Sequence, residues 1–508
     1  MLFGQRRNGS HGFSRSFLPT CLVTNTTIAS GRSSTFFFNL FAMTQTLSEA
    51  LEGIAEERSE SLLALIRDNN DKSNRKIVVL DDDPTGTQTV YDTPVLTTWG
   101  VDELAAAFTS PGSLFYVLTN SRSLTEPDAI KLANEIGANL NEAAQRTKQK
   151  FVVVSRSDST LRGHYPAEVD AIAAAVGTSD AVHVIAPFFL QGGRYTIGDV
   201  HYVAEDEQLV PAAETPFAQD AAFGFQNSDL KQWVIEKHNG NIDADQIASV
   251  RLNELRSSDL SSLTDRLANL SPGSVCIVNA ACMRDMEAFV LAAQNAEQKG
   301  QTFVYRTAAS FVQAFAGLEP RELLTPDEMV DGNTKTGLVV VGSYVPKTTQ
   351  QLASLLENEP TSKSIVLDVD KLLADDSESY LLEVTQLVNE SLQSANVVLS
   401  SSRKLVTGTD AASSLSIGNR VSDALVSVVR RLTKRPRFLI AKGGITSSDV
   451  ATKGLQAKHA MVLGQILPGV PVWKMPADSH FPGIAYVVFP GNVGGTNALL
   501  EAFQKLKA

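Results

Sequence analysis

The sequence predicts an α/β protein with two α/β domains, largely parallel sheets and a cleft between the domains that would hold an active site. Short runs that are apolar throughout recur along the chain and alternate with segments whose apolar residues have helical spacing. Strands of this kind are buried on both faces, as in a parallel sheet covered by helices. A polar stretch with helix breakers at 319–336 divides the pattern. We therefore expect an N-terminal domain over 46–320 and a C-terminal domain over 337–508.

Continuous apolar runs mark the expected strands, and apolar residues at helical spacing mark the expected helices. In the N-terminal half we expect strands at 76–80, 114–118, 151–154, 182–186 and 275–279, and helices at 46–69, 101–108, 126–144, 166–176, 226–237 and 284–298. In the C-terminal half we expect strands at 338–341, 365–367, 396–400, 437–441 and 485–489, helices at 346–357 and 413–433, and a closing helix.

Composition narrows the class of protein. The chain has 508 residues, of which 43% are hydrophobic and 20% charged, as in ordinary globular proteins. Its formal net charge of −12 argues against a nucleic-acid partner. No run approaches the roughly 18 apolar residues of a membrane span, so we expect no membrane partner. The three cysteines (Cys21, Cys276 and Cys282) form no disulfide framework, which favours a reducing, cytoplasmic location. Neither they nor the seven histidines have the spacing of metal ligands, and we predict no structural metal.

Residues 1–45 differ in composition from the rest of the chain. They are rich in serine, threonine and arginine, and the first acidic residue is Glu49. This composition is typical of a mitochondrial transit peptide, which would place the protein in mitochondria if residues 1–42 are such a signal. A disordered tail, or a true start at Met43, explains the same segment. We leave it out of the fold.

Polar residues follow each of the first four predicted strands. Asp81–Asp83 follow the first, Arg122 the second, Arg156 and Asp158–Gly163 the third, and Arg194 the fourth. The carboxyl ends of parallel strands share one edge of a sheet, where α/β proteins bind ligands. Arginine binds carboxylate and phosphate through two parallel hydrogen bonds. The pattern predicts a pocket for a small anion that bears hydroxyls, although the same arginines could also pair with Asp83 and Asp158.

Glycine and hydroxyl residues follow three predicted strands of the C-terminal half. They are Gly342-Ser343, Gly443-Gly444 with Thr446, and Gly491 to Gly494. Glycine lets backbone N–H groups approach a phosphate, and a helix N-terminus favours negative charge. None of these loops has the Walker A pattern. Together they predict a nucleotide-phosphate site.

These motifs resemble those of the four-carbon acid sugar kinases, over about residues 76–505. Asp82-Asp83-Pro84-Thr85-Gly86 resembles the family's first block, Asp158–Gly163 its most specific signature, and Pro187 with Gly193-Arg194 its third block. The three glycine loops resemble its nucleotide-binding loops. The chain departs from the family at Val345, where a serine is usual, and at Phe489-Pro490, where Lys-Ser is usual.

The resemblance implies an ATP-dependent kinase that uses Mg²⁺ to phosphorylate a hydroxyl of threonate, erythronate or a 3-oxo-tetronate. Asp82, Asp83 and Asp158 would bind hydroxyls, with Asp83 our first choice to orient or deprotonate the attacking one. Arg162 would act at the transferring group or the carboxylate, and Arg122, Arg156 and Arg194 would bind the substrate. ATP would be held by Ser343, Gly443, Gly444, Thr446, Gly491 and Gly494.

Two other functions fit part of the sequence. Asp81-x-Asp83-x-Thr85 after an apolar strand also resembles haloacid-dehalogenase phosphatases, in which Asp81 would be the nucleophile. We find no later acidic pair for that fold between 180 and 300. A non-catalytic sugar-acid-binding protein is the second alternative, because both departures lie in the expected ATP domain. Which sugar acid is bound and whether the chain forms homo-oligomers stay open.

Overall fold

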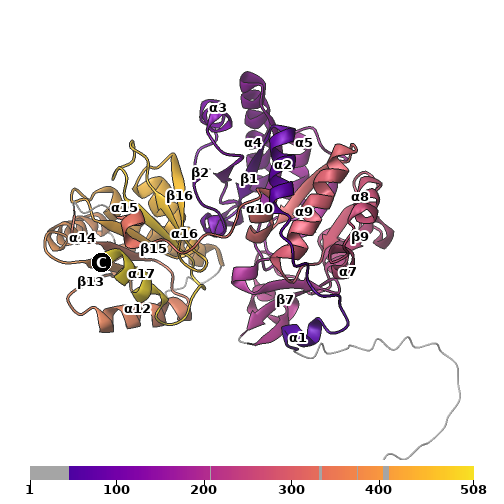
Figure 1. The fold of residues 1–508 in the computed structure, drawn as a ribbon. Coiled ribbons are helices and arrows are strands. Elements are labelled where there is room, and N and C mark those ends of the chain that lie inside the picture. Colours follow the sequence, from indigo (N-terminus) through magenta and orange to yellow (C-terminus); the bar gives the residue numbers. More distant parts are fainter. Residues whose placement is uncertain (1–44, 206, 331–333, 375, 404–410) are drawn as a thin grey trace, which may run out of the picture. The chain divides into compact units, whose positions relative to one another are not determined.

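The computed structural model describes residues 45–508 except 206, 331–333, 375 and 404–410 (Figure 1). The expectations for residues 1–44, including Cys21 and a start at Met43, lie outside the described residues. The described residues form one compact unit. No helix in the described part of the chain is long and apolar enough to cross a bilayer.

Within the described residues, fifteen strands form one hydrogen-bonded sheet. The strands of the N-terminal half are all parallel, in the order β2 (Thr93–Leu96), β3 (Leu114–Leu118), β1 (Arg75–Asp81), β4 (Lys150–Arg156), β11 (Phe303–Thr307), β5 (Val182–Ala186), β10 (Val275–Val278) and β9 (Ile247–Val250). A separate antiparallel sheet contains β6 (Arg194–Ile197), β7 (Val200–Glu205) and β8 (Gln208–Pro211).

The C-terminal half continues the large sheet. Its parallel strands are β13 (Lys363–Leu367), β14 (Val397–Ser401), β12 (Leu338–Val341), β15 (Phe438–Lys442) and β18 (Ala485–Phe489). The antiparallel hairpin of β16 (His459–Leu467) and β17 (Val470–Lys474) joins them to β2. The α/β class with mostly parallel strands is therefore confirmed, and the two sets of parallel strands are joined edge to edge.

Three antiparallel steps, from β2 through β16 and β17 to β18, reverse the strand direction between the halves. Neighbouring strands twist by about 20–25°, so the six steps from β1 to β15 accumulate roughly 120–150°. This rotation largely cancels the reversal of direction. The carboxyl ends of both sets of parallel strands can therefore face one shared pocket.

Helices cover both faces of the sheet, as its fully apolar strands require. In the N-terminal half they are α1 (Leu47–Ala50), α2 (Leu63–Ser73), α3 (Val101–Thr109), α4 (Glu126–Thr147), α5 (Ala167–Ala175), α6 (Leu230–Lys237), α7 (Leu252–Leu255), α8 (Ser261–Ala268), α9 (Met283–Gln298) and α10 (Ala309–Phe315). The later helices are α11 (Pro326–Met329), α12 (Pro346–Asn358), α13 (Val369–Leu373), α14 (Ser377–Ser391), α15 (Ala411–Arg430), α16 (Gly444–Asp449) and α17 (Ala498–Lys507).

The expected single helix at 46–69 is wrong. Two helices, α1 and α2, are separated by a non-helical segment that contains Gly53 at a φ of +75°. Contacts with distant residues hold this segment: the Ala55 N–H donates to Asn253 Oδ1 over 3.0 Å, and the Leu62 N–H donates to Glu287 Oε2 over 2.8 Å. Tertiary hydrogen bonds thus override the helical spacing of the apolar residues.

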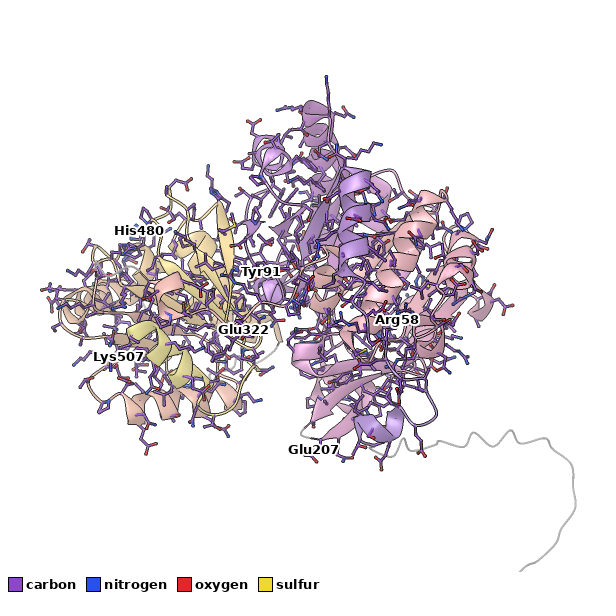
Figure 2. The ribbon with its side chains drawn as sticks, in the orientation of Figure 1. Arg58, Tyr91, Glu207, Glu322, His480 and Lys507 are labelled. Carbon is purple, nitrogen blue, oxygen red and sulfur yellow. The ribbon has the colours of Figure 1, made fainter. Side chains whose placement is uncertain are left out.

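Several strands were not expected from the sequence. The central strand β11 carries Arg306, which is fully buried and stacks 5.0 Å from the Trp233 ring centroid, so it does not read as an apolar run. The β16–β17 hairpin was also missed, although β16 alternates between buried and more exposed residues. Beyond α10, Arg321 lies 5.4 Å from the ring centroid of Tyr91, which is labelled in Figure 2.

The packing of α4 on α5 makes a testable prediction about stability. A Cβ added at Gly137 of α4 would lie 2.4 Å from the Cβ of Ala175, closer than atoms can pack. We expect Gly137→Ala to lower the free energy of unfolding, because overpacking costs about 1–3 kcal/mol and the gain in helix propensity is only about 1 kcal/mol. Urea denaturation measures the change.

Gly418→Ala is the matched control, because the same substitution in α15 meets no atom within 4 Å. It should raise the free energy of unfolding by about 0.5–1 kcal/mol. Equal stabilisation by both substitutions would contradict the packing described for α4 and α5.

Candidate functional site

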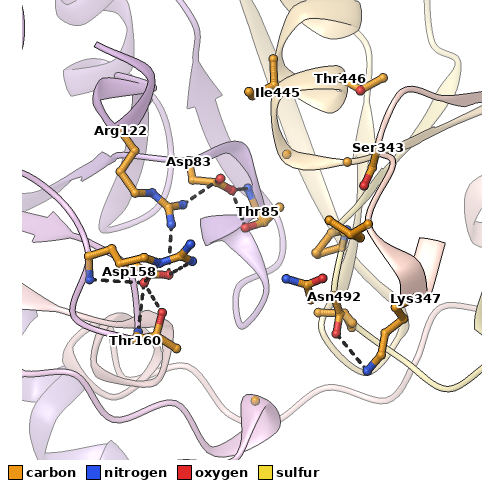
Figure 3. A pocket seen from close by; sticks show the side chains of 18 of the residues that line it. Asp83, Thr85, Arg122, Asp158, Thr160, Ser343, Lys347, Ile445, Thr446 and Asn492 are labelled. Atoms are coloured by element: carbon orange, nitrogen blue, oxygen red, sulfur yellow. Dashed lines mark hydrogen bonds and ion pairs between the residues drawn. The ribbon is translucent and has the colours of Figure 1, made fainter. Parts of the chain in front are cut away.

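A pocket of about 1080 Å³ lies where the carboxyl ends of strands from both halves meet (Figure 3). All residues that the sequence singled out for the kinase site line it, apart from Asp82; Asp81, the nucleophile of the phosphatase alternative, does not line it either. From the N-terminal half these are Asp83, Arg122, Arg156, Asp158, Arg162 and Arg194, and from the C-terminal half they are Ser343, Gly443, Gly444, Thr446, Gly491 and Gly494.

Arg122 connects the loops that follow β1 and β4. Its guanidinium lies 2.7 Å from Asp83 Oδ2, 3.0 Å from Asp158 Oδ1 and 3.3 Å from Asp82 Oδ2, and Figure 3 shows the first two of these pairs. Burial alone would lower the pKa of Arg122, but the surrounding aspartates raise it above its ordinary value. Arg122 is therefore a permanent cation that balances the carboxylates at the floor of the pocket.

Asp83 is an ionised acceptor at the centre of the pocket. Its Oδ1 accepts hydrogen bonds from the Thr85 N–H at 2.8 Å and the Thr85 hydroxyl at 2.5 Å. Burial would raise the pKa of Asp83, yet Arg122 and the Thr85 hydrogen bonds hold it below its ordinary value. A Cβ added at Gly444 would lie 2.9 Å from Asp83 Oδ2, so this carboxylate comes close to the glycine loop of the other half.

Asp158 organises the turn that follows β4. It accepts hydrogen bonds from the Thr160 hydroxyl, from the Thr160 N–H at 3.2 Å and from Arg162 Nε at 2.9 Å. Burial would raise the pKa of Asp158, but Arg162 and Arg122 hold it well below its usual range. Leu161 has a φ of +70° and Gly163 a φ of +118°, so the turn depends on left-handed backbone at both positions.

Asp81 and Asp82 lie behind the pocket rather than in its lining. Asp81 is 1% exposed and pairs with Arg156 Nη1 at 3.2 Å. Burial outweighs this attraction and raises the pKa of Asp81 to about 8, and burial also raises the pKa of Asp82. A Cβ at Gly86 would lie 2.0 Å from Asp81 Oδ1, so the chain closes directly over this carboxylate.

Two arginines at the pocket share an aromatic neighbour that the sequence did not indicate. Phe217 lies 5.1 Å from the Arg162 guanidinium and 5.7 Å from that of Arg194, measured to its ring centroid. Arg194 makes no ion pair within the described part of the chain, and burial lowers its pKa. Its charge is thus available to an anionic ligand.

The glycine loops of the C-terminal half pack tightly against hydroxyl side chains. A Cβ at Gly342 would lie 2.2 Å from Thr446 Oγ1, and Gly443 has a φ of +121°. The Thr348 hydroxyl lies 3.2 Å from both Ser343 Oγ and the Gly491 carbonyl. The close approach of backbone at three neighbouring strand ends leaves peptide groups open to the pocket.

The pocket also contains residues that the sequence reading missed. Tyr344 and Ile445 line it with exposed fractions of 62% and 54%. On the same side of the pocket Lys347 Nζ donates to the Asn492 carbonyl (Figure 3). Each of the four lies within a few residues of a glycine that was singled out, so wider windows around those glycines would have found them. Phe217 lies in a short 3-10 helix (Pro216–Gln219) after β8 and had no such signal.

No cluster of three or more His, Cys, Asp or Glu side chains in the described ranges could hold a metal ion. Arg122 occupies the space between the three aspartates at this site. Mg²⁺ in phosphate sites usually takes one or two carboxylates together with substrate phosphates, so a closed protein cage is not required. Asp83 and Asp158, which are ionised and line the pocket, are the carboxylates that would fit this role.

The Arg122 contacts predict a large effect on folding. Arg122→Ala should lower the free energy of unfolding by about 3–5 kcal/mol, because it leaves buried carboxylates without their counter-charge. Arg146→Ala is the control: Arg146 is 51% exposed and pairs with Asp102 and Glu142, so its loss should cost at most about 1 kcal/mol. Chemical denaturation of both variants tests this, and similar costs would contradict the role assigned to Arg122.

Comparison with known proteins adds independent findings. A model described as a sugar-binding N-terminal domain matches residues 77–315, and one described as a nucleotide-binding C-terminal domain matches residues 338–499. No curated protein matches the chain significantly.

Solved structures share the fold at low identity. A Salmonella typhimurium LT2 protein provisionally named a tRNA synthase superposes with a TM-score of 0.61 at 17% identity, covering 85% of this chain and all of its own. The Haemophilus influenzae protein HI1011, of family DUF1537, gives a TM-score of 0.57 at 18% identity, covering 84% of this chain and all of its own. At these identities the likeness concerns the fold.

Proposed function

Because the chain belongs to the four-carbon acid sugar kinase family, we propose that it is an ATP-dependent kinase that phosphorylates a hydroxyl of a four-carbon sugar acid. The substrate would be of the threonate, erythronate or 3-oxo-tetronate type. The observation that carries the proposal is the single pocket that has arginines and aspartates on one side and glycine loops on the other. The closeness of the two sides, where a Cβ added at Gly444 would lie 2.9 Å from Asp83 Oδ2, supports transfer across this pocket.

Each side of the pocket has a distinct task in this proposal. Arg162 and Arg194 bind the substrate carboxylate or the transferring phosphoryl group. Arg194 has no ion-pair partner in the described residues, and Phe217 packs against both guanidinium groups. Arg122 keeps Asp83 and Asp158 ionised, and Arg156 fixes the position of Asp81 behind them. Asp83 orients or deprotonates the attacking hydroxyl, and its lowered pKa supports a carboxylate that accepts hydrogen bonds.

The loops around Ser343, Gly443, Gly444, Thr446, Gly491 and Gly494 hold ATP in this proposal, and Mg²⁺ supplies charge neutralisation at the phosphates. We assign residues 46–320 to sugar-acid binding and 337–508 to nucleotide binding. In this proposal the partners are small molecules, with no nucleic acid and no membrane, and the protein acts in the cytoplasm. A homo-oligomer is compatible with the assignment.

The phosphatase alternative is not favoured. Its nucleophile would be Asp81, which is 1% exposed, is covered by Gly86 and does not line the pocket. A nucleophile must reach the phosphorus of its substrate. Trapping of an aspartyl-phosphate on Asp81 would nevertheless restore this alternative.

The kinase assignment predicts the effect of two substitutions. Asp83→Asn should lower kcat by about 10²–10⁴-fold, because the amide cannot accept the proton of the attacking hydroxyl. Arg162→Ala should lower kcat/KM by removing charge at the anion site. ADP formation with a panel of four-carbon sugar acids measures both. The exposed Arg146→Ala should turn over like the wild type, and normal turnover by both pocket variants would refute these roles.

Calorimetry with Mg-ATP separates the kinase from a non-catalytic sugar-acid-binding protein. We expect saturable binding to the wild type, and weaker binding to Gly443→Val, because an added Cβ would lie 3.0 Å from the Ser343 Cβ and the backbone is left-handed. Gly240→Val, also at positive φ but outside the pocket, controls for backbone strain. Absence of nucleotide binding to the wild type would favour the non-catalytic alternative.

A further inference from the structure

Lys442 is a buried cation without a carboxylate partner in the described part of the chain. It is the last residue of β15 and is 0% exposed. Because Lys442 pairs in register with Phe489 of β18, its Nζ lies 4.1 Å from the Phe489 ring centroid. The ammonium donates to the Pro490 carbonyl at 2.5 Å and to the Gly491 carbonyl at 3.2 Å. It therefore holds the loop that follows β18 from behind.

Lys347 holds the same loop from the pocket side. It is exposed, lines the pocket, and donates to the Asn492 carbonyl at 3.5 Å (Figure 3). It lies in the first turn of the thirteen-residue helix α12, whose N-cap Val345 provides no side-chain cap. A cation is unfavourable at a helix N-terminus, since the dipole already makes that end positive. An anion bound nearby would offset this unfavourable placement.

The two ammonium groups repel each other across the loop. Burial, together with the charge of Lys347, lowers the pKa of Lys442 to about 7. Two acids near these elements are already paired: Asp83, which faces Gly444, is bound by Arg122, and Asp449 of α16 lies 2.9 Å from Lys453 Nζ. A third cation, Arg403, donates from Nη2 to the Ser343 carbonyl at 2.6 Å and to the Thr349 hydroxyl at 3.0 Å. Buried charge without a counter-ion is costly, so the arrangement is completed by a ligand with several negative charges.

We propose that Pro490–Asn492, held by Lys347 and Lys442, is the polyphosphate subsite of the pocket, and that Lys442 takes up a proton from solvent when the polyphosphate binds. The inference rests on the proposed function, of which it specifies the nucleotide end. Lys347 would contact the phosphates directly, whereas Lys442 is a positioning residue that acts through the loop carbonyls. The family's usual Lys-Ser before this loop is replaced here by Phe489-Pro490. Lys442 of the neighbouring strand β15 lies beside Phe489 and places its ammonium group at the Pro490 carbonyl instead.

Proton uptake determines the direction in which the binding affinity changes with pH. Below pH 7 Lys442 is already charged and binding needs no proton. Above pH 7 each binding event must add one, so affinity should fall, with a limiting slope of tenfold per pH unit. Removing Lys347 should weaken binding and also move the onset of this fall to higher pH, because Lys442 loses its repelling neighbour.

The experiment is isothermal titration of the full chain with inorganic tripolyphosphate and with Mg-ATP, between pH 6 and 9, in buffers of different ionisation enthalpy. The wild type should take up close to one proton at pH 8. Lys442→Met should bind more weakly at pH 6.5 and take up none. Lys442→Arg, which is charged at every pH, should bind without proton uptake and without the fall in affinity. Lys458→Met, an exposed lysine outside this pocket, should match the wild type.

Two results would overturn the inference: failure of the wild type to bind tripolyphosphate, or proton uptake that persists in both Lys442 variants. These measurements need no sugar acid. If the wild type shows the expected proton-linked binding but phosphorylates none of the four-carbon acids, the polyphosphate subsite stands and the kinase proposal fails. If turnover is normal and Lys442→Arg retains the wild-type pH dependence, the kinase stands and the subsite fails.

Discussion

The N-terminal side of the pocket depends on one arginine that contacts three carboxyl groups. Arg122 lies within 3.3 Å of Asp82, Asp83 and Asp158, which follow two different strands. None of these carboxylates could be buried alone, because the loss of hydration would exceed the stability of a typical domain. Once they are paired, the strand-end loops have a fixed spacing, and Arg162 and Arg194 are placed around an opening of matching charge. Folding and ligand recognition thus share the same ion pairs.

The two sides of the pocket differ in the charged groups that they present. On the N-terminal side positive and negative groups alternate, which suits a ligand that carries both a carboxylate and hydroxyls. On the C-terminal side Lys347 and Lys442 donate hydrogen bonds to backbone carbonyls. The lining there includes loop residues and the start of helix α12, without acidic side chains among the described residues. An acidic protein with a net charge of −12 therefore gathers cationic side chains at this pocket, where they suit a small anionic ligand.

Much of the architecture follows from patterns that a sequence can display. Fully apolar strands with polar ends predicted that Asp83, Arg122 and Asp158 would meet, because parallel strands share an edge. The separation of Asp81 and Asp82 from Asp83 could not be predicted, since it depends on how Gly86 closes over Asp81. Strand β11 was hidden because its buried Arg306 finds partners, including the Arg162 carbonyl at 3.0 Å, that only the folded chain supplies. Phe217 was missed because it lies in a four-residue 3-10 helix, which is too short to show a periodic apolar pattern.

The hairpin β16–β17 has a mechanical consequence. Four register pairs from His459↔Leu96 to Val462↔Thr93 connect β16 to β2, and Trp473 of β17 donates to the Thr87 hydroxyl at 3.0 Å. The halves are therefore attached by a backbone ladder as well as by the covalent segment at 319–336. A free hinge at that segment would break the ladder. Any movement that narrows the pocket must instead wind or unwind the sheet, so its elastic stiffness limits how far substrates can draw the two sides together.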